Sequence, residues 1–387
     1  MGILTEALRP LLTRGLETGP FPITSANIIE FLGGEASATG KRISPEGALK
    51  LSAVWDCVDM VSRDIARTPV PLYRRSGRDR EKADESALYN LLHLSPNPFM
   101  TAFTFKQALQ GHKMLRGNAY ANIERDEDGN PVNLWPLNPI MMEPPVISAA
   151  GTLLYLYHTP RGEQVALTQD EVLHIRGLSN DGILGYSPIT LMRELVALGM
   201  AYQEFSARFF GNNANPGGVL LAEKRLTDEA SKRLKDSWET AHRGLEQSHR
   251  VAVLEEGIKW QQIGMALEDA QFVESSKLNR IEIASMWHIP AHKINELDRA
   301  TFTNITEQDL DYEGSALDGE FAMWEQQLNM SLLTRLQQRR MYFEFTRNAL
   351  VRASIDKRFG AYQKAWWLTG NEIRERENLN SIEGLDQ

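Results

Sequence analysis

Two groups of residues resemble ligand-binding loops, and each lacks a part that the ligand would need. Gly40-Lys41 could belong to a phosphate-binding loop, but Glu35 stands where that loop requires its first glycine. Asp126, Asp128 and Asn130 match the first ligands of a calcium loop, while proline and leucine fill its sixth and twelfth positions. We therefore expect a flexible linker at the first site, a hairpin turn at the second, and no bound metal.

Histidine, serine and cysteine side chains could support catalysis, but none has the neighbours that catalysis requires. His288 and His292 have a zinc-ligand spacing, yet Pro290 lies between them and keeps them off a common helix face. Ser187 lacks the second glycine of a nucleophile elbow, so helix capping is the better interpretation. Cys57, the one cysteine, lies among valines at helical spacing and is predicted to be a buried structural thiol.

Residues 281–294 resemble a DNA-binding helix-turn-helix in their spacing of isoleucine, alanine and turn residues. The recognition helix would be Ala291 to Leu297, which is short and is followed by Asp298 rather than by a basic surface. A sequence-specific DNA-binding protein is therefore an alternative hypothesis. A further alternative is an α/β hydrolase or nuclease whose site has no recognised motif.

Acidic side chains gather where a long helix is expected to begin. Glu307 and Asp311 are like charges four residues apart, an arrangement that destabilises a helix by about 0.3 kcal/mol. Carboxylates near a helix N-terminus are favoured by its positive dipole, so a solvated face explains them without a ligand. The group comprises Glu307, Asp309, Asp311, Glu313, Asp318 and Glu320.

Length and composition place the chain among ordinary globular proteins. Its 387 residues allow about two or three domains, and 42% hydrophobic with 24% charged residues excludes disorder and collagen. The net charge of −9 argues against a protein that grips nucleic acid through a basic surface, because neutralised phosphates need Lys or Arg. Charged residues and proline interrupt the apolar residues of Met1 to Phe31, so we expect a soluble, unexported protein without a membrane segment.

Periodicity and capping signals predict an α+β unit over residues 44 to 180, preceded by an arm at residues 1 to 43. Ser44-Pro45 begins a helix that runs to Thr68-Pro69, and a second helix from Thr101 ends at Gly117. The expected strands are 70–74, 118–124, 132–137, 153–157, 164–167 and 172–175, with a charged loop up to 86 and a short helix over 88–92.

The second half is predicted to be mainly helical, with one small α/β insert. Ser187-Pro188 caps a long helix to about Phe210, and a helix from Asp269 to Trp287 could run beside it and hold the insert away from the body. The insert comprises strands at 219–221, 250–254 and 258–263 and a helix at 227–242. From Asn304 a very long helix carries one apolar stripe, formed by Leu317, Phe321, Trp324, Leu328, Leu332 and Leu336. A strand at 342–345, a helix at 355–367 and a helix with a capping box at 369–372 close the chain.

From about Ala48 to the C-terminus, the order of these pieces resembles the portal protein, or head–tail connector, of tailed double-stranded-DNA bacteriophages. Each motif is weak alone, but their order over nearly the whole chain is a strong signal. The motifs are Ser52-Ala53-Val54-Trp55-Asp56-Cys57-Val58, Pro69-Val70-Pro71-Leu72-Tyr73, Ser95-Pro96-Asn97-Pro98 with Thr101, Arg116-Gly117-Asn118-Ala119-Tyr120, Trp135-Pro136-Leu137, Val172-Leu173-His174-Ile175-Arg176-Gly177, Gly185-Tyr186-Ser187-Pro188-Ile189, Pro216-Gly217-Gly218-Val219-Leu220, Glu268-Asp269-Ala270-Gln271-Phe272, Ile289-Pro290, Arg299-Ala300-Thr301-Phe302-Thr303-Asn304, and Thr369 with Asn371-Glu372-Ile373-Arg374.

The resemblance implies an α+β portal fold and a ring, expected to be a dodecamer, at one vertex of the capsid in the virion, assembled in the host cytoplasm. The implied divisions are an N-terminal arm at 1–43, a wing at 44–186, a first stem helix at 187–213, a clip at 214–266, a second stem helix at 267–290, a tunnel loop and long helix at 291–339, and a returning wing strand with C-terminal helices at 340–387. The chain ends soon after its last helix, so the crown that these helices form is expected to be short.

The resemblance also implies partners and the residues that meet them. Double-stranded DNA would pass through the channel without sequence specificity, along Asp298, Arg299, Ala300, Thr301, Phe302, Thr303, Asn304, Glu307 and Asp311. The clip would dock the large terminase subunit and later a head-completion or adaptor protein, with Lys224, Arg225, Asp228, Lys232, Lys235 and Arg243 as candidate contacts. The wing would face the major capsid protein.

No catalytic group or cofactor is implied, because in such phages the terminase hydrolyses ATP and cuts DNA. The net charge of −9 then acquires a role, since twelve copies would carry about −108 and an acidic lumen would let DNA slide. We expect the apolar stripe of the long helix to pack against neighbouring subunits and its acidic residues to face the lumen. Arg299 is the one candidate for a direct phosphate contact.

Overall fold

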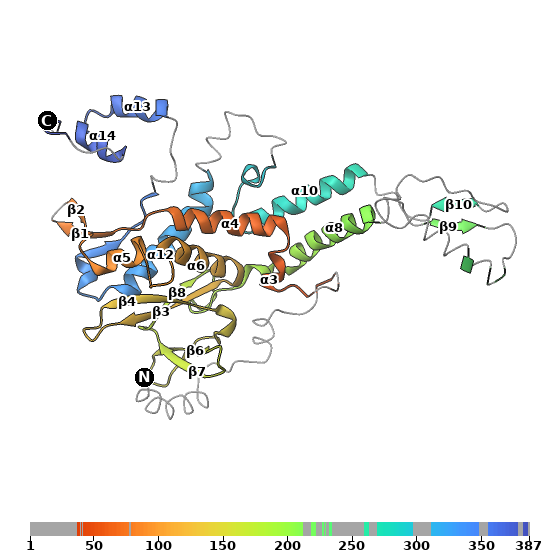
Figure 1. Ribbon diagram of the computed structural model, residues 1–387, viewed down its shortest axis with the longest axis horizontal. Coiled ribbons are helices and arrows are strands. Elements are labelled where there is room, and N and C mark those ends of the chain that lie inside the picture. Colours follow the sequence, from red (N-terminus) through yellow and green to blue (C-terminus); the bar gives the residue numbers. More distant parts are fainter. Residues whose placement is uncertain are drawn as a thin grey trace.

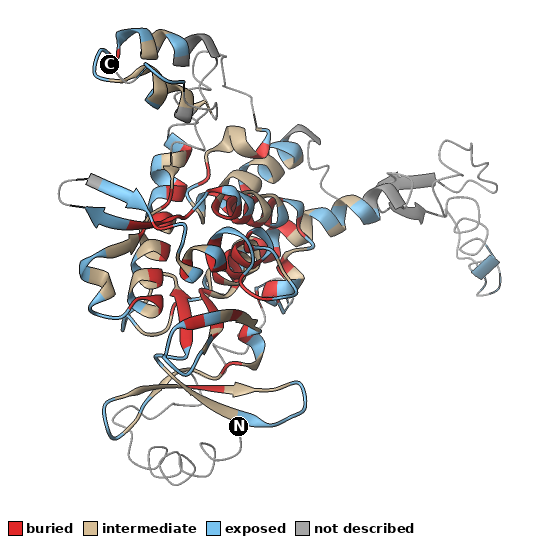
Figure 2. Cartoon of the chain, turned by 60° about the vertical axis from the view of Figure 1, so that its left-hand side comes forward, coloured by how far each residue is buried: buried red, intermediate tan, exposed pale blue. Residues whose placement is uncertain are grey.

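The computed structural model describes residues 37–38, 40, 42–76, 79–211, 218–221, 227, 229, 232–233, 259–262, 269–296, 311–347, 355–377 and 382–385. Within these residues the chain forms an α+β fold of helices and small antiparallel sheets, which confirms the predicted fold class (Figure 1). The buried residues concentrate in the body of the molecule, where its helices and sheets meet (Figure 2).

The first described helices are α3 (Pro45–Ala48) and α4 (Ser52–Arg67). The Ser44 hydroxyl accepts a hydrogen bond from the Gly47 amide at 2.9 Å, which confirms the predicted N-cap. The single helix predicted from this cap is wrong, because Leu51 takes an extended conformation and separates the two helices. Leu51 itself is 7% exposed and belongs to the core.

Helices α5 (Ala87–His93) and α6 (Ala102–Arg116) follow, and α6 packs along α4 in the centre of the body. Thr101 caps the start of α6 through a bond from the Thr104 amide. Gly117 ends it in the left-handed conformation at φ 73°, so both predicted ends of this helix are confirmed.

Three antiparallel sheets of three strands each lie in the body. Strands β3 (Asn118–Arg125), β4 (Pro131–Leu137) and β8 (Val172–Arg176) lie in the order β4-β3-β8, and the predicted hairpin is confirmed. Strands β5 (Val146–Ile147), β6 (Leu153–His158) and β7 (Gln164–Thr168) form a second sheet, reached through the turn η1 (Pro139–Met141). Tyr120, Met142, Tyr155 and Val172 form a small buried cluster between these two sheets.

The third sheet joins distant parts of the chain. Strand β1 (Leu72–Ser76) pairs on one side with β2 (Asp79–Lys82) and on the other with β11 (Met341–Phe343). Strand β2 lies in the stretch that the sequence predicts to be a charged loop. All four of its residues are charged and show no apolar alternation, so its pairing with β1 is the only signal of a strand.

Two antiparallel helices extend from the body toward the small sheet of β9 (Gly218–Leu221) and β10 (Lys259–Gln262), as Figure 1 shows. They are α8 (Arg193–Gly211) and α10 (Asp269–Ser285), and they lie side by side. A short helix α7 (Pro188–Leu191) precedes α8, so the long helix predicted from Ser187 is broken at Met192. The predicted strand of residues 250–254 and most of the predicted helix of residues 227–242 lie outside the described residues.

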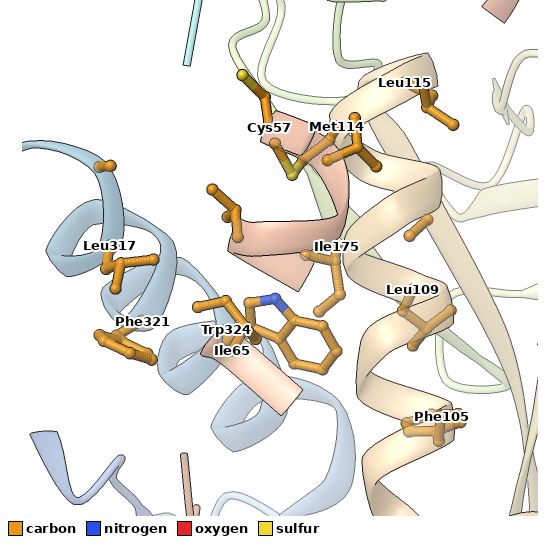
Figure 3. Close-up of a cluster of buried hydrophobic side chains, with 14 of the residues drawn as sticks. Cys57, Ile65, Phe105, Leu109, Met114, Leu115, Ile175, Leu317, Phe321 and Trp324 are labelled. Carbon is orange, nitrogen blue, oxygen red and sulfur yellow. The ribbon is translucent and has the colours of Figure 1, made fainter. Parts of the chain in front are cut away.

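Helix α12 (Asp318–Leu332) follows a π-helical turn, η4 (Glu313–Leu317), and crosses α4 and α6 (Figure 3). Its stripe residues are fully buried within this chain, so the expectation that the stripe packs against neighbouring subunits is wrong. The predicted stripe is also too long, because α12 ends at Leu332 and Leu336 is 76% exposed. The buried stripe residues are Leu317, Phe321, Trp324, Leu328 and Leu332.

The remaining elements are the turns η3 (Ala291–Ile294) and η5 (Gln337–Arg339) and the C-terminal helices α13 (Ile355–Lys364) and α14 (Gly370–Arg376). Thr369 and Glu372 form the predicted capping box, in which each side chain accepts a hydrogen bond from the other residue's backbone amide.

Candidate functional site

Two segments flank the predicted channel loop, one ending at Glu296 and one beginning at Asp311, and both are fixed to the body. In the first segment, Glu296 forms an ion pair with Arg280 of α10 at 3.3 Å, and Arg280 also donates to the Ile294 carbonyl at 3.2 Å. Asn295 takes the left-handed conformation at φ 62°, which asparagine tolerates better than most residues. These contacts fix the end of η3 against α10.

On the second segment, Tyr312 is 5% exposed and donates a hydrogen bond to Asp64 of α4 at 2.8 Å. Burial, and next the negative charge of Asp64, raise the pKa of Tyr312, so the hydroxyl stays protonated and keeps this bond. The ammonium of Lys293 lies 5.0 Å from the Tyr312 ring centroid. The two segments therefore meet, and residues 297–310 connect two adjacent fixed points.

The predicted channel residues lie almost entirely between these two points. Asp311 is exposed at the start of the second segment. The others, Asp298, Arg299, Ala300, Thr301, Phe302, Thr303, Asn304 and Glu307, lie outside the described residues.

The acidic residues at the start of α12 do not form one open face. Glu320 pairs with Lys113 of α6, and its side chain is 20% exposed. Asp318 pairs with Arg347, which also contacts Glu325 at 3.3 Å. Glu320 is therefore used inside the chain, and the expectation that it faces a lumen is wrong, whereas the Asp318 side chain remains 52% exposed.

Helices α8 and α10 approach closely at one point. A Cβ atom on Gly199 would lie 2.6 Å from the Asn279 Oδ1 atom, and the Asn279 amide donates to the Leu195 carbonyl at 3.1 Å. Farther along, the Phe272 ring contacts the rings of Tyr202 and Phe205, with centroids 5.6 and 5.1 Å away. Gly199 thus lets the two helices approach closely, and the aromatic cluster holds them together farther along.

The predicted docking residues belong to the segment between these helices. Lys232 is exposed, whereas Lys224, Arg225, Asp228, Lys235 and Arg243 lie outside the described residues.

Two of the residues that could have supported catalysis, Ser187 and Cys57, have structural roles. The Ser187 hydroxyl accepts from the Thr190 amide at 3.2 Å and donates to the Leu115 carbonyl at 2.8 Å, so it caps a helix as predicted. Cys57 is fully buried, and burial raises the pKa of its thiol to about 12, which keeps it protonated and unreactive. The described residues contain no group of three or more His, Cys, Asp or Glu side chains that could hold a metal ion.

The helix-turn-helix hypothesis is contradicted by the geometry after α10. The candidate recognition helix is the four-residue 3-10 turn η3, and it ends at Asn295. Four residues cannot lie along a major groove as a recognition helix does.

The Asp126 carboxylate accepts from the amides of Asp128 and Asn130, which confirms the predicted hairpin turn at these residues.

Two buried polar clusters were not predicted from the sequence. Lys113 and Gln110 of α6 both contact Glu320 of α12. His174 of β8 contacts Asn118 at 3.0 Å and Tyr155 at 3.2 Å. Each cluster joins residues that are distant in the sequence, so no local spacing could indicate it.

In the part of the chain that the structure describes, no helix is both long and apolar enough to span a bilayer.

Comparison with known sequences identifies a family. The sequence model of the phage portal protein family matches residues 52–378. The portal protein of Enterobacteria phage HK97 is 28% identical over 353 residues, which cover 89% of this chain and 82% of that protein. The probable portal protein of Streptomyces phage phiC31 is 27% identical over 373 residues, which cover 92% and 80% of the two chains.

Solved structures share the fold. A chain from the virion of a native gene transfer agent particle aligns with a TM-score of 0.60 and 19% identity, covering 97% of this chain and 99% of that one. A chain from the neck of that native particle, computed with C12 symmetry, aligns at 0.59 and 21% identity, covering 98% and 100%. The crystal structure of an HK97 family phage portal protein from Corynebacterium diphtheriae gives 0.59 and 18%, covering 82% and 99%.

Proposed function

This chain belongs to the phage portal protein family, and from that premise we propose that twelve copies assemble into a ring-shaped channel at one vertex of a capsid. Double-stranded DNA passes through this channel during packaging and ejection. The family match over residues 52–378 is the observation that carries the proposal, because it spans the body, both extended helices and the C-terminal helices.

The structure supports a division of the chain between these roles. The body up to residue 186, together with β11, forms the wing and faces the major capsid protein. Helices α8 and α10 form the stem, and residues 214–266 form the clip. The β9–β10 sheet stands at the end of the stem, clear of the body, which suits a docking element for the large terminase subunit and later for an adaptor protein (Figure 1).

Residues 298–304, which lie between the described residues Glu296 and Asp311, are the channel loop in this proposal. The described residues on either side of this segment lie close together, because the Lys293 ammonium is 5.0 Å from the Tyr312 ring centroid. A loop with adjacent, fixed ends can extend into a lumen without moving the helices on either side. Arg299 is its candidate for phosphate contact, and the protein needs no catalytic group or cofactor for this work.

Mass and shape test the ring directly. Native mass spectrometry of the purified full chain should give an assembly about twelve times the 43.7 kDa subunit, and electron micrographs should show annular particles. Only monomers, even with capsid protein and terminase added, would overturn the proposal.

The channel loop is tested separately, by measuring how much DNA particles package and retain. Arg299→Glu and Phe302→Ala should impair packaging or retention while rings still form. Arg63→Glu is the matched control, since Arg63 is exposed on α4 with a side chain 63% accessible. If both loop variants package and hold DNA like the parent, the loop assignment is wrong.

A further inference from the structure

An acidic chain carries one sheet face that is strongly basic. In the β11-β1-β2 sheet, Tyr73 pairs in register with both Tyr342 and Lys82, and Arg75 pairs with Arg80. Paired residues of antiparallel strands point to the same face, and alternate residues of one strand share a face. Together with Arg340, whose carbonyl accepts from the Arg75 amide at 2.8 Å, they form what we name the arginine face: Tyr73, Arg75, Arg80, Lys82, Arg340 and Tyr342.

The opposite face of the same sheet points inward. Leu72 and Phe343 pair there and are almost fully buried in the core. On the arginine face the four cationic residues are exposed, whereas Tyr73 beneath them is buried, at 9% exposed. Figure 2 shows the β1–β2 hairpin as mostly exposed.

Two of the three guanidinium groups on this face are held in place by aromatic rings. Arg75 lies over the Tyr342 ring at 5.1 Å, and Arg80 lies over the Tyr73 ring at 4.7 Å. The two rings are 5.7 Å apart and tilted by 31°, so the four side chains form one interleaved stack. A guanidinium positioned by stacking keeps its N–H groups available to an anion and loses less entropy when it binds one.

The exposed carboxylates Glu81, Asp84 and Glu85 lie on or next to the β1–β2 hairpin, but the ion pair that the structure gives to this face comes from Glu344. Glu344 pairs with Arg80, which retains 53% side-chain exposure. The structure gives Arg75, Lys82 and Arg340 no ion pair with a described carboxylate. An ordinary solvated surface of this chain would be net acidic, because the whole chain carries −9. Such a concentration of positive charge indicates a polyanionic partner.

We propose that the arginine face binds the phosphate backbone of duplex DNA without reading its sequence. Three strands span about 10 Å, a length over which each DNA strand presents about three phosphates. Arginine over tyrosine is suited to phosphate groups, and the face has no Asn or Gln that could read adenine edges.

The position of the face adds to this argument, and this step rests on the proposed function. The β1–β2 hairpin and the β9–β10 sheet lie at opposite ends of the molecule (Figure 1). If β9–β10 docks the packaging motor outside the capsid, the arginine face lies at the end nearer the packaged DNA. In this arrangement the channel lets DNA slide, whereas the arginine face, which belongs to the wing, holds DNA.

Salt-dependent binding tests the proposal. Fluorescence anisotropy would measure the affinity of the full chain for a short labelled duplex between about 50 and 200 mM salt. Each phosphate contact contributes about 0.9 to the slope of log K against log salt, so Arg75→Gln combined with Arg340→Gln should reduce the slope by about 2. Arg75→Lys should keep most of the slope, because the charge remains.

A matched double variant controls for net charge. Arg63→Gln with Arg161→Gln removes two exposed arginines on other elements and should leave the slope unchanged. Arg299→Gln controls for the channel loop. The proposal is overturned if the parent does not bind duplex, if the matched control loses as much slope as the face variant, or if Arg299→Gln alone abolishes binding.

A second comparison distinguishes DNA from an acidic protein partner. Poly-glutamate should compete much less well than unlabelled duplex, and equal competition would contradict a DNA site. Native mass spectrometry of the same samples separates this proposal from the ring. A monomeric chain that loses DNA affinity only in the face variant would contradict the ring while supporting the arginine face.

Discussion

The indole Nε1 of Trp324 donates a hydrogen bond to the side-chain Oε1 of Gln110 over 2.8 Å, and both residues are fully buried. The same glutamine uses its amide to donate to Glu320 at 2.8 Å, and Glu320 also pairs with Lys113. Figure 3 shows Trp324 lying between α12 and α6. One polar network thus fixes α12, which leads away from the proposed channel loop, against the central helix of the body.

Removal of the Glu320 carboxylate should weaken this polar network. Glu320→Ala leaves the Lys113 ammonium, on a side chain only 9% exposed, without its acceptor, and also frees the Gln110 amide. Unpaired groups of this kind cost about 2 kcal/mol or more. We expect a lower midpoint of thermal unfolding, measured at fixed protein concentration because assembly shifts apparent stability.

The control for this prediction is an ion pair on the surface. Asp59 pairs with Arg63 at 3.3 Å, and the Arg63 side chain is 63% exposed. Asp59→Ala should change stability by no more than about 0.5 kcal/mol. Equal losses in Asp59→Ala and Glu320→Ala would show that burial does not strengthen the Glu320 network.

Two glycines lie where backbone segments meet, and a side chain fits at neither. A Cβ on Gly117 would lie 1.9 Å from the Tyr186 carbonyl oxygen, and a Cβ on Gly185 would lie 2.2 Å from the Gly117 carbonyl oxygen. Gly117 also has a φ of 73°, which strains any other residue. Gly117→Ala should therefore cost about 3 kcal/mol or more, seen as poor soluble yield and a reduced unfolding midpoint.

Gly162→Ala is the control that separates backbone strain from the steric overlap expected in Gly117→Ala. Its φ is 83°, but no atom lies within 4 Å of its added Cβ. Gly162→Ala should cost only about 1 to 2 kcal/mol, from the left-handed backbone alone. If Gly117→Ala costs no more than Gly162→Ala, the approach to Tyr186 is not a constraint.

The elements that the sequence predicts well are those with local signals. The caps at Thr101, Gly117, Ser187 and Thr369 depend on residues within four positions, and the structure has each where predicted. Strand β2 has no such signal, because four charged residues become a strand only through pairing with β1.

Contacts between residues that are distant in the sequence limit how much of the candidate site can be predicted. An apolar stripe shows that a helix buries one face, but not whether the covering surface comes from its own chain or from another. Trp324 meets Gln110 across 214 residues, and Glu320 meets Lys113 across 207. The acidic pattern near Glu320 was therefore interpretable as a solvated or lumen-facing surface until its basic partner was located.

The crossing of α8 and α10 gives a prediction about helix packing. A Cβ on Gly199 would lie 2.6 Å from Asn279 and 2.7 Å from Leu51. Gly199→Ala should move the helices apart or break the Asn279 bond to the Leu195 carbonyl, costing about 1 to 3 kcal/mol. Thermal unfolding of the variant would measure this loss.

Gly319 is the matched helical control. It lies in α12, and no atom is within 4 Å of an added Cβ. Gly319→Ala should stabilise the protein by about 0.5 to 1 kcal/mol, because alanine has the higher helix propensity. The opposite signs expected for Gly199→Ala and Gly319→Ala test packing against propensity, and destabilisation by both would contradict the role assigned to the crossing.

A buried histidine gives the body a specific response to acid. His174 is fully buried between Asn118 and Tyr155, and burial, with a smaller effect of Arg176, holds its pKa well below the usual value. Its neutral ring donates through Nε2 to the Asn118 oxygen, which also accepts from the Gly185 amide at 2.8 Å. Folding therefore requires the unprotonated form.

The sign of the pH effect follows from this requirement. In the unfolded chain a histidine titrates near about pH 6.5, so below that pH the unfolded state binds a proton that the folded state excludes. Stability should fall as pH decreases below about 6.5, by at most about 1.4 kcal/mol per pH unit, until the pH reaches the folded pKa. Above about pH 7.5 the histidine should contribute no pH dependence.

His174→Gln isolates this contribution, because glutamine keeps polar atoms at the site but does not titrate. The variant should be less stable than the parent at pH 8, and the difference should narrow by up to about 2 kcal/mol by pH 5. Tyr155→Phe is the control, since it removes the hydroxyl bonded to His174 but keeps the titrating ring, so its acid response should persist. Burial also lowers the pKa of His112, so the His174→Gln protein should retain part of the slope. A stability difference between parent and His174→Gln that stays constant from pH 8 to 5 would show that His174 does not have to be neutral for this fold to form.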